Sequence, residues 1–498
     1  MEKRSANALH QAGPPFLNLM SESALETLHS FIDGQFLPSN GTLLSWNSPQ
    51  EGGQTVPLIE ASNALCDQAI ANACAAFRSH AAAPIVDRAA WLTQAAALLE
   101  QRVDAIAALL VNDIGKPVRV ARTEVVRGVQ FLRACAAQLQ TLTGETLPLD
   151  AVAAGVGRHG LVRRVPYGVV VAVTPFNAPV NLLVQKVAPA LAAGNAVIAK
   201  PHLGGTRAAL AVAALFVEAG LPAGLFNVIC GDRAPARALV RDPRVRVVTF
   251  TGGTAAGDAL AREAGAKKFV AELGSNAANV VLADADLADA ARRIAAAAFE
   301  ASGQQCVSAQ RVIVEAAAYD RFLPLFVEAA QALRVGSAAD ESTDIGPMVS
   351  RAAADRVMDM ARQSVASGAR YALEPRQTGC QVSPGILIDA PANSPIWADE
   401  AFGPLAVIQR AADAQEALDL ANDSPFGLQG AVFTRSLGNT FLFAEGFEVG
   451  SLWINEASRF RLDIYPFGGA KQSGFGREGV RYAIEELSQL RFIGIRPL

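Results

Sequence analysis

The stretch VRVVTFTGGTAAG, residues 245–257, passes from a β-branched apolar run into a glycine-rich turn. The run 245–250 predicts a buried strand, and the Ala-rich residues 254–265 predict a helix. Glycines at such a joint let a phosphate approach the backbone N–H groups of the helix N-terminus, and the turn contains Gly252, Gly253 and Gly257. The spacing is not G-x-G-x-x-G, so this stretch taken alone is more often a plain strand–helix turn.

The same alternation extends outward in both directions. Further strands are predicted at residues 169–173, 196–199, 226–229, 269–271, 279–282, 311–314, 430–433 and 491–496. Helical periodicity begins at Ser62, and helices are predicted at residues 85–112, 118–142, 206–219, 234–240, 286–302, 317–333, 351–368 and 479–488. Because the strands are apolar throughout, we expect an α/β fold with two doubly wound parallel-sheet domains in succession.

The composition is that of a folded, soluble protein. Of 498 residues, 51% are hydrophobic and 18% charged, which excludes disorder as a global description. The net charge of −4 gives no general attraction to nucleic acid or to an anionic membrane, so neither partner is expected. Polar residues interrupt the apolar stretch 180–199, and residues 1–20 contain no apolar core of a secretory signal. We therefore expect a cytoplasmic protein.

Cysteine and histidine are both scarce. The six cysteines form no C-x-x-C pair, which suits a reducing compartment better than a disulfide scaffold. The last of the five histidines is His202, and no spacing of ligands indicates a metal site. A cysteine nucleophile in the C-terminal half would therefore have no local histidine, and a carboxylate is the more available base.

Three further segments carry polar side chains next to predicted elements. Thr174-Pro175-Phe176-Asn177 follows strand 169–173, where parallel sheets place ligands, and the Asn177 amide can donate to an oxyanion. Glu272-Leu273 follows strand 269–271. Gly303-Gln304-Gln305-Cys306 follows helix 286–302, with polar neighbours that are unusual for a structural cysteine. We interpret Cys306 as a candidate nucleophile and Glu272 as its candidate base. Taken singly, these segments also fit an ordinary turn, a surface carboxylate and a core cysteine.

Together and in this order, the four segments resemble the aldehyde dehydrogenase superfamily from about residue 30 to the end of the chain. Supporting motifs are AKP at 199–201, EAFGP at 400–404 and PFGG at 466–469. The resemblance implies a Rossmann-like cofactor domain, a catalytic domain and a small β arm used in oligomerisation. The expected boundaries are a tail at 1–28, the NAD(P)-binding domain at 29–144 and 163–273, the catalytic domain at 274–472, and the arm with the C-terminal segment at 145–162 and 473–498.

The resemblance also implies roles for individual residues. Cys306 would attack the aldehyde carbon, Asn177 would hold the oxyanion, and Glu272 would activate the water that hydrolyses the thioester. NAD or NADP would accept the hydride, and the cofactor-binding residues would be Thr174, Pro175, Phe176, Lys200, Gly252, Gly253, Gly257, Leu273, Glu400 and Phe402. The substrate pocket would include Asn177, Gln185, Gln305, Arg461 and Phe467, and no metal is implied.

Departures from the family pattern bear on specificity. Leu203 stands where many NAD-preferring members carry a Glu, so a 2′-phosphate is not repelled, and Arg207 or His202 would be placed to assist it. The segment FRLD, residues 460–463, is similar to a subgroup acting on lactaldehyde-like, phosphonate- or sulfonate-bearing aldehydes. Arg461 would clamp such an anion through its planar fork, or equally lie at a surface or an interface.

The expected function is oxidation of a small, polar or anionic aldehyde to its carboxylic acid by a homodimer or homotetramer. One alternative is a CoA-acylating aldehyde dehydrogenase, in which a thiol takes the acyl group; retention of Glu272 argues against it. A second alternative is a catalytically idle family member with a binding role. Retention of the candidate catalytic and ribose-binding residues argues against that reading: Cys306, Asn177, Glu272, Lys200 and Glu400.

Overall fold

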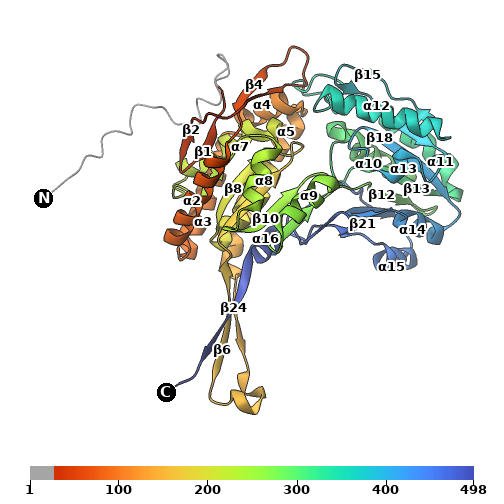
Figure 1. Ribbon diagram of the computed structural model, residues 1–498. Coiled ribbons are helices and arrows are strands. Elements are labelled where there is room, and N and C mark those ends of the chain that lie inside the picture. The colour runs from red at the N-terminus through yellow and green to blue at the C-terminus, as the bar shows by residue number, and fades with distance from the viewer. Residues whose placement is uncertain (1–26, 498) are drawn as a thin grey trace.

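The computed structural model describes residues 27–497, and Figure 1 shows two α/β lobes with a narrow β arm extending away from them. Each lobe is built around one largely parallel sheet, so the predicted fold class is confirmed. The expected tail at 1–28 falls almost entirely outside the described residues. Leu28, however, is buried and forms a β-bridge with Leu58. Within residues 27–497, no helix is both long enough and apolar enough to cross a membrane.

The first lobe contains a mixed sheet whose central strands are parallel. Within residues 27–497 its strand order is β2 (Gln35–Leu37), β1 (Ser30–Ile32), β9 (Phe226–Val228), β8 (Ala196–Pro201), β7 (Val169–Thr174), β10 (Val245–Thr251), β11 (Lys268–Glu272) and β23 (Gly474–Phe475). The five neighbouring strands β9, β8, β7, β10 and β11 run parallel to one another. Strands β1, β2 and β23 are antiparallel to their neighbours and form the two edges of the sheet. The central strands β7 and β8 are buried at every position, as expected for a sheet covered on both faces.

The second lobe repeats this plan in the C-terminal half. Its strand order is β14 (Arg370–Leu373), β17 (Gly385–Ile388), β18 (Leu405–Ala411), β13 (Arg311–Glu315), β12 (Ala278–Val281), β20 (Gln429–Phe433) and β21 (Ser451–Ile454). All neighbouring strands are parallel except β14, which pairs antiparallel with β17. Short antiparallel pairs complete the described strands: β3 (Leu43–Asn47) with β4 (Thr55–Ile59), β15 (Gln377–Thr378) with β16 (Gln381–Val382), and β19 (Phe426–Gly427) with β22 (Ala470–Lys471).

Helices pack against both sheets. The first lobe has α2 (Asn63–His80), α3 (Ile85–Gln101), α4 (Val103–Ile114), α5 (Val118–Gln138), α6 (Asn181–Ala193), α7 (Thr206–Glu218), α8 (Arg233–Arg241), α9 (Thr254–Ala264) and α16 (Val480–Glu486). The second lobe has α10 (Leu287–Phe299), α11 (Ala316–Gln331), α12 (Arg351–Ala366), α13 (Pro395–Ala398), α14 (Ala414–Asn422) and α15 (Leu437–Gly446). Ser62 caps α2 by accepting a hydrogen bond from the Leu65 N–H, which agrees with the predicted start.

The arm is a three-stranded antiparallel sheet, counted within the described chain, in the order β24 (Ser488–Ile495), β6 (His159–Pro166) and β5 (Glu145–Leu147). Strands β6 and β24 pair along their whole length, from Ser488 opposite Pro166 to Ile495 opposite His159. Figure 1 shows this sheet projecting beyond both lobes. Apolar side chains on its edge strand β24 remain exposed, with Leu490 at 60% and Phe492 at 55% of full exposure.

Several predicted boundaries are wrong for identifiable reasons. The predicted helix 85–112 is two helices, because Arg102 leaves helical geometry at φ −119° and ψ 22° although the apolar stripe continues past it. The predicted helix 118–142 ends at Gln138 and continues as a 3₁₀ turn. The predicted helix 286–302 ends at Phe299, because Ala301 and Ser302 adopt left-handed backbone conformations. The short strands β1 to β4 and strands β17, β18 and β21 were not predicted at all.

Candidate active site

Parallel strands bring the predicted site segments to one edge of the first sheet. Strands β8, β7, β10 and β11 are neighbours, and their paired residues Val173 and Lys200, and Thr251 and Glu272, lie at the carboxyl ends. The segment Thr174–Asn177 continues directly from β7. Because the carboxyl ends of parallel strands form the ligand-binding edge of a doubly wound sheet, this is where a dinucleotide and a substrate would meet.

The glycine-rich turn after β10 leaves the start of α9 accessible. Gly252 N donates a hydrogen bond to the Glu272 carbonyl oxygen at 3.1 Å, which holds the turn beside β11. A Cβ atom at Gly257 would clash with Leu273, so glycine there lets α9 lie close to β11. A Cβ atom at Gly253, the N-cap residue of α9, would meet nothing within 4 Å. This open helix N-terminus fits a pyrophosphate.

Two ionisable residues, Lys200 and Glu400, lie near this edge of the sheet. Lys200 is buried, its Nζ donates to the Pro201 carbonyl oxygen at 2.8 Å, and burial lowers its pKa to about 8. Glu400 accepts a hydrogen bond from the Ser275 N–H at 3.0 Å, and burial raises the pKa of its carboxyl to about 7. A Cβ at Gly274 would come within 2.8 Å of Glu400 Oε2, so glycine makes room for this carboxylate.

Aromatic contacts link the two lobes across the same edge. Phe402, from the second lobe, has a left-handed backbone with φ 43° and meets the Phe176 ring edge-on at 5.8 Å between centroids. Phe176 also contacts the His202 ring at 5.2 Å. Open backbone donors, a lysine, a carboxylate and flat aromatic rings together fit a nicotinamide dinucleotide. Among residues 27–497, no group of three or more His, Cys, Asp or Glu side chains is placed to hold a metal ion.

Two residues predicted to assist a 2′-phosphate are differently engaged. Arg207 is buried and binds Asp113 through Nε at 3.0 Å and through Nη2. Its fork is therefore occupied by a carboxylate, and the prediction that it would assist the phosphate is wrong. His202 Nδ1 accepts a hydrogen bond from the Gly204 N–H at 3.1 Å, and burial lowers its pKa to about 4. A neutral imidazole adds no positive charge here.

The loop before Cys306 is held by three consecutive left-handed residues, Ala301, Ser302 and Gly303, with φ of 51°, 60° and 62°. Such geometry costs energy for residues other than glycine and persists only where tertiary contacts impose it. Ser302 Oγ donates to the Gly346 carbonyl oxygen at 2.7 Å, and a Cβ at Gly303 would clash with the Gly403 carbonyl oxygen. The turn directs the chain out of α10 and toward the end of β11.

Cys306 and Glu272 influence each other directly. Burial, and then the negative charge of Glu272, raise the pKa of the Cys306 thiol well above its usual value. Burial, and then the charge of Glu478, raise the pKa of the Glu272 carboxyl to about 7, while Arg461 and the Cys306 thiol oppose the rise. Neither Glu272 oxygen, both fully buried, accepts a hydrogen bond from a nitrogen or hydroxyl donor of the described residues. Burial therefore favours the neutral form of both groups, and each one affects the pKa of the other.

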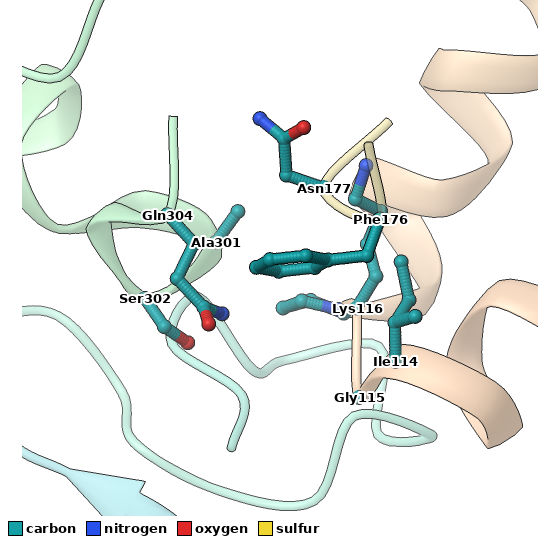
Figure 2. Close-up of a pocket in the computed structure, with 9 residues that line it drawn as sticks. Ile114, Gly115, Lys116, Phe176, Asn177, Ala301, Ser302 and Gln304 are labelled. Atoms are coloured by element: carbon teal, nitrogen blue, oxygen red, sulfur yellow. The ribbon is translucent and has the colours of Figure 1, made fainter. Parts of the chain in front are cut away.

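Asn177 lies in a pocket beside the loop that leads to Cys306. Figure 2 shows Asn177 and Phe176 on one side of this pocket and Ala301, Ser302 and Gln304 on the other. The same pocket contains Lys116, which forms a buried ion pair with Glu124. The structure thus places the Asn177 amide close to the candidate nucleophile loop, where it can face the oxygen of a bound carbonyl.

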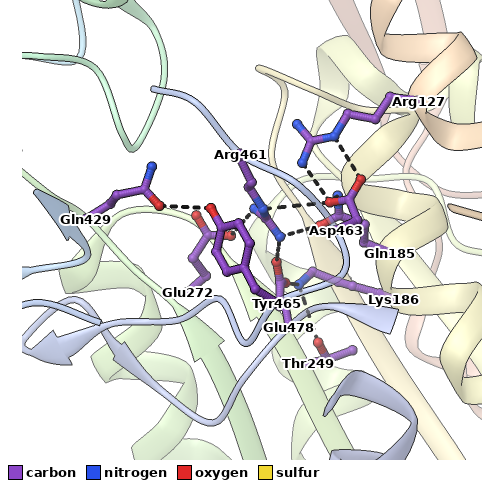
Figure 3. Close-up of polar contacts among 10 residues, drawn as sticks. All are labelled: Arg127, Gln185, Lys186, Thr249, Glu272, Gln429, Arg461, Asp463, Tyr465 and Glu478. Atoms are coloured by element: carbon purple, nitrogen blue, oxygen red, sulfur yellow. Dashed lines mark hydrogen bonds and ion pairs between the residues drawn. The ribbon is translucent and has the colours of Figure 1, made fainter. Parts of the chain in front are cut away.

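Arg461 lies at the centre of a charged network on the substrate side (Figure 3). Its guanidinium carbon is 3.6 Å from the centroid of the buried Phe467 ring, and Phe467 belongs to the small apolar cluster against which Cys306 packs. Its Nη2 donates to Gln185 Oε1 at 2.7 Å and to Glu478 Oε2 at 2.9 Å. Its Nε is buried and has no hydrogen-bond partner in the described chain. The carboxylate oxygen paired with this Nε is Asp463 Oδ1 at 3.8 Å, beyond hydrogen-bond distance.

Several charged residues of this network were not predicted from the sequence. Lys186 Nζ binds Glu478 Oε1 at 2.8 Å, and Arg127 binds both carboxylate oxygens of Asp463. Only Lys186 could have been singled out from the sequence, because it is a lysine in an otherwise apolar stretch. In the structure it lies in the fully buried helix α6. Burial alone would raise the pKa of Glu478, but the charges and hydrogen bonds of Lys186 and Arg461 outweigh it and lower the pKa to about 2.

The fold and the edge of the first sheet define a dinucleotide-dependent oxidoreductase. The chain belongs to the aldehyde dehydrogenase family, whose family model matches residues 36–493. It is 38% identical to "Aspartate-semialdehyde dehydrogenase 1" of Pseudomonas canavaninivorans, covering 86% of this chain and 90% of that protein. It is 39% identical to the 3-sulfolactaldehyde dehydrogenase of Priestia megaterium, covering 81% and 84%. It resembles the crystal structure of the NADP-dependent glyceraldehyde-3-phosphate dehydrogenase of Bacillus halodurans with NADP, at a TM-score of 0.92 and 32% identity, covering 95% and 99%. The protein is accordingly an NAD(P)-dependent aldehyde dehydrogenase.

Proposed function

We propose that the protein oxidises a small anionic aldehyde to its carboxylic acid. The observation that carries this proposal is Arg461, whose side chain is 6% exposed, packs on Phe467 in the apolar cluster that Cys306 contacts, and makes no hydrogen bond through Nε to any described residue. A guanidinium at this place binds a carboxylate or sulfonate through charge-assisted hydrogen bonds. Relatives named for aspartate semialdehyde, sulfolactaldehyde and sulfoacetaldehyde, all aldehydes that carry a carboxylate or a sulfonate, support a substrate with an anionic group.

In the proposed mechanism, Cys306 Sγ bonds to the aldehyde carbon while the thiol proton passes to Glu272. The Asn177 amide and the Cys306 backbone N–H donate to the resulting oxyanion, a contribution of about 3–4 kcal/mol in related sites. The bound NAD or NADP supplies the hydride acceptor. Glu272 releases this first proton to solvent and then takes a proton from water, whose oxygen attacks the thioester carbon; the carbon–sulfur bond breaks, and the Cys306 thiolate leaves and regains its proton from Glu272.

The proposed cofactor contacts follow the edge of the first sheet. Lys200 and Glu400 would hold the two ribose units, and Phe402 would pack near the nicotinamide. The turn at Gly252 and Gly253 would hold the pyrophosphate, with Gly257 and Leu273 setting its position. The segment Thr174–Phe176 would flank the dinucleotide. At Leu203 no carboxylate repels a 2′-phosphate, so this chain would accept NADP as well as NAD.

We further propose that the arm binds a second copy of this chain, giving a homodimer or homotetramer. Leu490 and Phe492 are two residues apart on β24 and therefore point to the same face, where both are more than half exposed. Strand β24 is also a free edge of its sheet, and a long apolar edge strand is a pairing surface. The proposed compartment is the cytoplasm, which suits six cysteines that are all free thiols.

The decisive experiment is a substrate panel followed by the absorbance of the reduced cofactor. Short aldehydes ending in carboxylate, sulfonate or methyl would be tested with NAD and with NADP, each with and without CoA. We expect cofactor reduction without CoA and the highest kcat/KM for the anionic members. A strict requirement for CoA would favour the acylating alternative, and no reduction with any aldehyde would favour the idle one.

A further inference from the structure

Three arginines in or next to the charged network of Figure 3 are each paired with a different carboxylate. Arg461 binds Glu478, Arg459 binds Glu300, and Arg127 binds Asp463. The Arg459 pair lies at the predicted pocket residue Gln305, whose Oε1 accepts from Arg459 Nε at 2.8 Å. The pairings decide how much positive charge remains available to a substrate.

In the Arg127–Asp463 pair, each positive charge is matched by one negative charge. Arg127 donates through Nε to Asp463 Oδ2 at 2.9 Å and through Nη2 to Oδ1 at 2.6 Å, the bidentate geometry of a fully matched fork. Gln185 Nε2 also donates to Oδ1, at 3.0 Å. With Asp463 facing it, Arg127 presents little net positive charge to the pocket, although its side chain is 30% exposed.

In the Arg461–Glu478 pair, by contrast, positive and negative charges are not matched one to one. Glu478 is a single carboxylate shared between two cations, Arg461 at 2.9 Å and Lys186 at 2.8 Å. One positive charge is left over, and the only further carboxylates near Arg461 among the described residues are Glu272 at 3.9 Å and Asp463 at 3.8 Å. Asp463 is already matched to Arg127. When Glu272 holds the thiol proton, one positive charge in the site is uncompensated; when Glu272 is ionised, none is. In either state the second charge of a dianionic substrate would lie uncompensated in a buried place.

From this charge balance we infer that Asp463 is a specificity-determining residue that restricts the substrate to one negative charge. By holding Arg127, Asp463 excludes a dianionic phosphate or phosphonate and favours a monoanionic carboxylate or sulfonate. This inference rests on the proposed preference for anionic aldehydes. It assigns the limit on charge to a residue that binds neither the cofactor nor the reacting carbon.

Two aldehydes of nearly equal shape test the inference: sulfoacetaldehyde and phosphonoacetaldehyde, which differ by one charge at pH 8. The wild-type enzyme is expected to show a kcat/KM at least about tenfold higher for the sulfonate, because like charges in a desolvated site repel strongly. Asp463→Asn frees Arg127 and should reduce that ratio about tenfold or more. The ratio should also rise with pH in the wild type as the phosphonate loses its second proton, with a pKa of about 6 in phosphate esters. This pH dependence should be weaker in Asp463→Asn.

Matched variants separate an effect of charge on substrate specificity from a general loss of folding. Glu100→Gln breaks another bidentate pair, Arg133 with Glu100 on exposed helix surface, and should leave the ratio unchanged. Arg127→Gln leaves Asp463 uncompensated and should raise the sulfonate-to-phosphonate ratio, the opposite of Asp463→Asn. A merely structural role would lower both activities equally and leave the ratio constant.

The outcomes distinguish the two proposals. If propanal and sulfoacetaldehyde have equal kcat/KM in the wild type, the anionic-substrate proposal itself is refuted. If sulfoacetaldehyde is preferred over propanal but the ratio is the same in wild type, Asp463→Asn and Arg127→Gln, only the role of Asp463 is refuted. Should Asp463→Asn fail to fold, the opposite shift expected of Arg127→Gln still decides.

Discussion

Arg461 Nη1 lies 3.9 Å from Glu272 Oε2, too far for a hydrogen bond but close enough for a strong charge interaction at a site where both side chains are almost fully buried. The cation proposed to hold the substrate anion thus also stabilises the ionised form of the proposed base. Opposing this, burial and Glu478 favour the protonated form, and the resulting pKa of Glu272 is about 7. Substrate affinity and base strength are therefore coupled through one guanidinium.

The proposed division of labour between thiol and carboxylate predicts two different kinetic defects. Cys306→Ala removes the atom that bonds to the substrate and should abolish turnover, by at least about 10⁴-fold. Glu272→Gln should still allow some hydride transfer but stall at the thioester. Rapid-mixing absorbance would show a burst of reduced cofactor near one equivalent per site, followed by a steady rate reduced about 10²–10⁴-fold. Normal steady-state turnover in either variant would refute the assigned roles.

The raised pKa of Glu272 predicts the pH dependence of kcat. A base must be ionised to accept a proton, so kcat should rise with pH through about 7 and level off above it. Glu478→Gln removes the negative charge that raises the pKa of Glu272, and it leaves Arg461 and Lys186 to lower it. The midpoint of the profile should therefore move to lower pH in that variant. Profiles that superimpose would contradict the proposed coupling.

The buried position of Arg461 predicts a defect in both stability and specificity. Arg461→Gln removes a charge-assisted hydrogen bond to Glu478 but leaves that carboxylate paired with Lys186, so unfolding in urea should show a loss of about 1.5–3 kcal/mol. The kcat/KM for a carboxylate- or sulfonate-bearing aldehyde should fall about 100-fold, whereas that for propanal should fall much less. Arg461→Lys keeps the charge but loses the planar fork and should give an intermediate result. An equal loss for neutral and anionic aldehydes would assign Arg461 to structure alone.

The sequence predicts those parts of the site whose residues follow recognisable strands or helices. It does not predict contacts between residues that are far apart in the chain. Asn177, Lys200, Gly252 and Glu272 each follow an apolar strand, and parallel strands align their carboxyl ends. Their convergence was therefore predictable without any contact information. The Lys186–Glu478 and Arg127–Asp463 pairs join residues 292 and 336 positions apart, and no local periodicity connects such partners.

The boundary errors have a similar origin. Ala301 and Ser302 follow an Ala-rich helix and have no local tendency to leave it, so the sequence extends the helix to residue 302. The left-handed turn is imposed from outside, by contacts of Ser302 with Gly346 and of Gly303 with Gly403. The same applies to strand β1, whose three residues are too short for a periodic signal and are placed by pairing with β9.

The uncharged residue at position 203 predicts tolerance of NADP. Leu203→Glu would place a carboxylate at the start of the 3₁₀ turn Leu203–Gly205, close to the proposed ribose site. Repulsion of a 2′-phosphate should lower kcat/KM for NADP about tenfold or more, while kcat/KM for NAD changes little. The ratio of the two, measured at saturating aldehyde, is the test. A parallel loss with both cofactors would show that position 203 acts on folding or on general binding.

The exposed apolar face of β24 predicts that assembly depends on the arm. Leu490→Asp combined with Phe492→Asp puts two charges where the second copy would pack, and light scattering should show a smaller species than for the wild type. Val86→Asp, at a position of α3 that is 71% exposed, is the matched control and should keep the wild-type mass. Because the arm extends beyond both lobes, each subunit should retain its far-UV circular dichroism. A monomeric wild type, or a double variant of unchanged mass, would exclude the arm as the site of self-association.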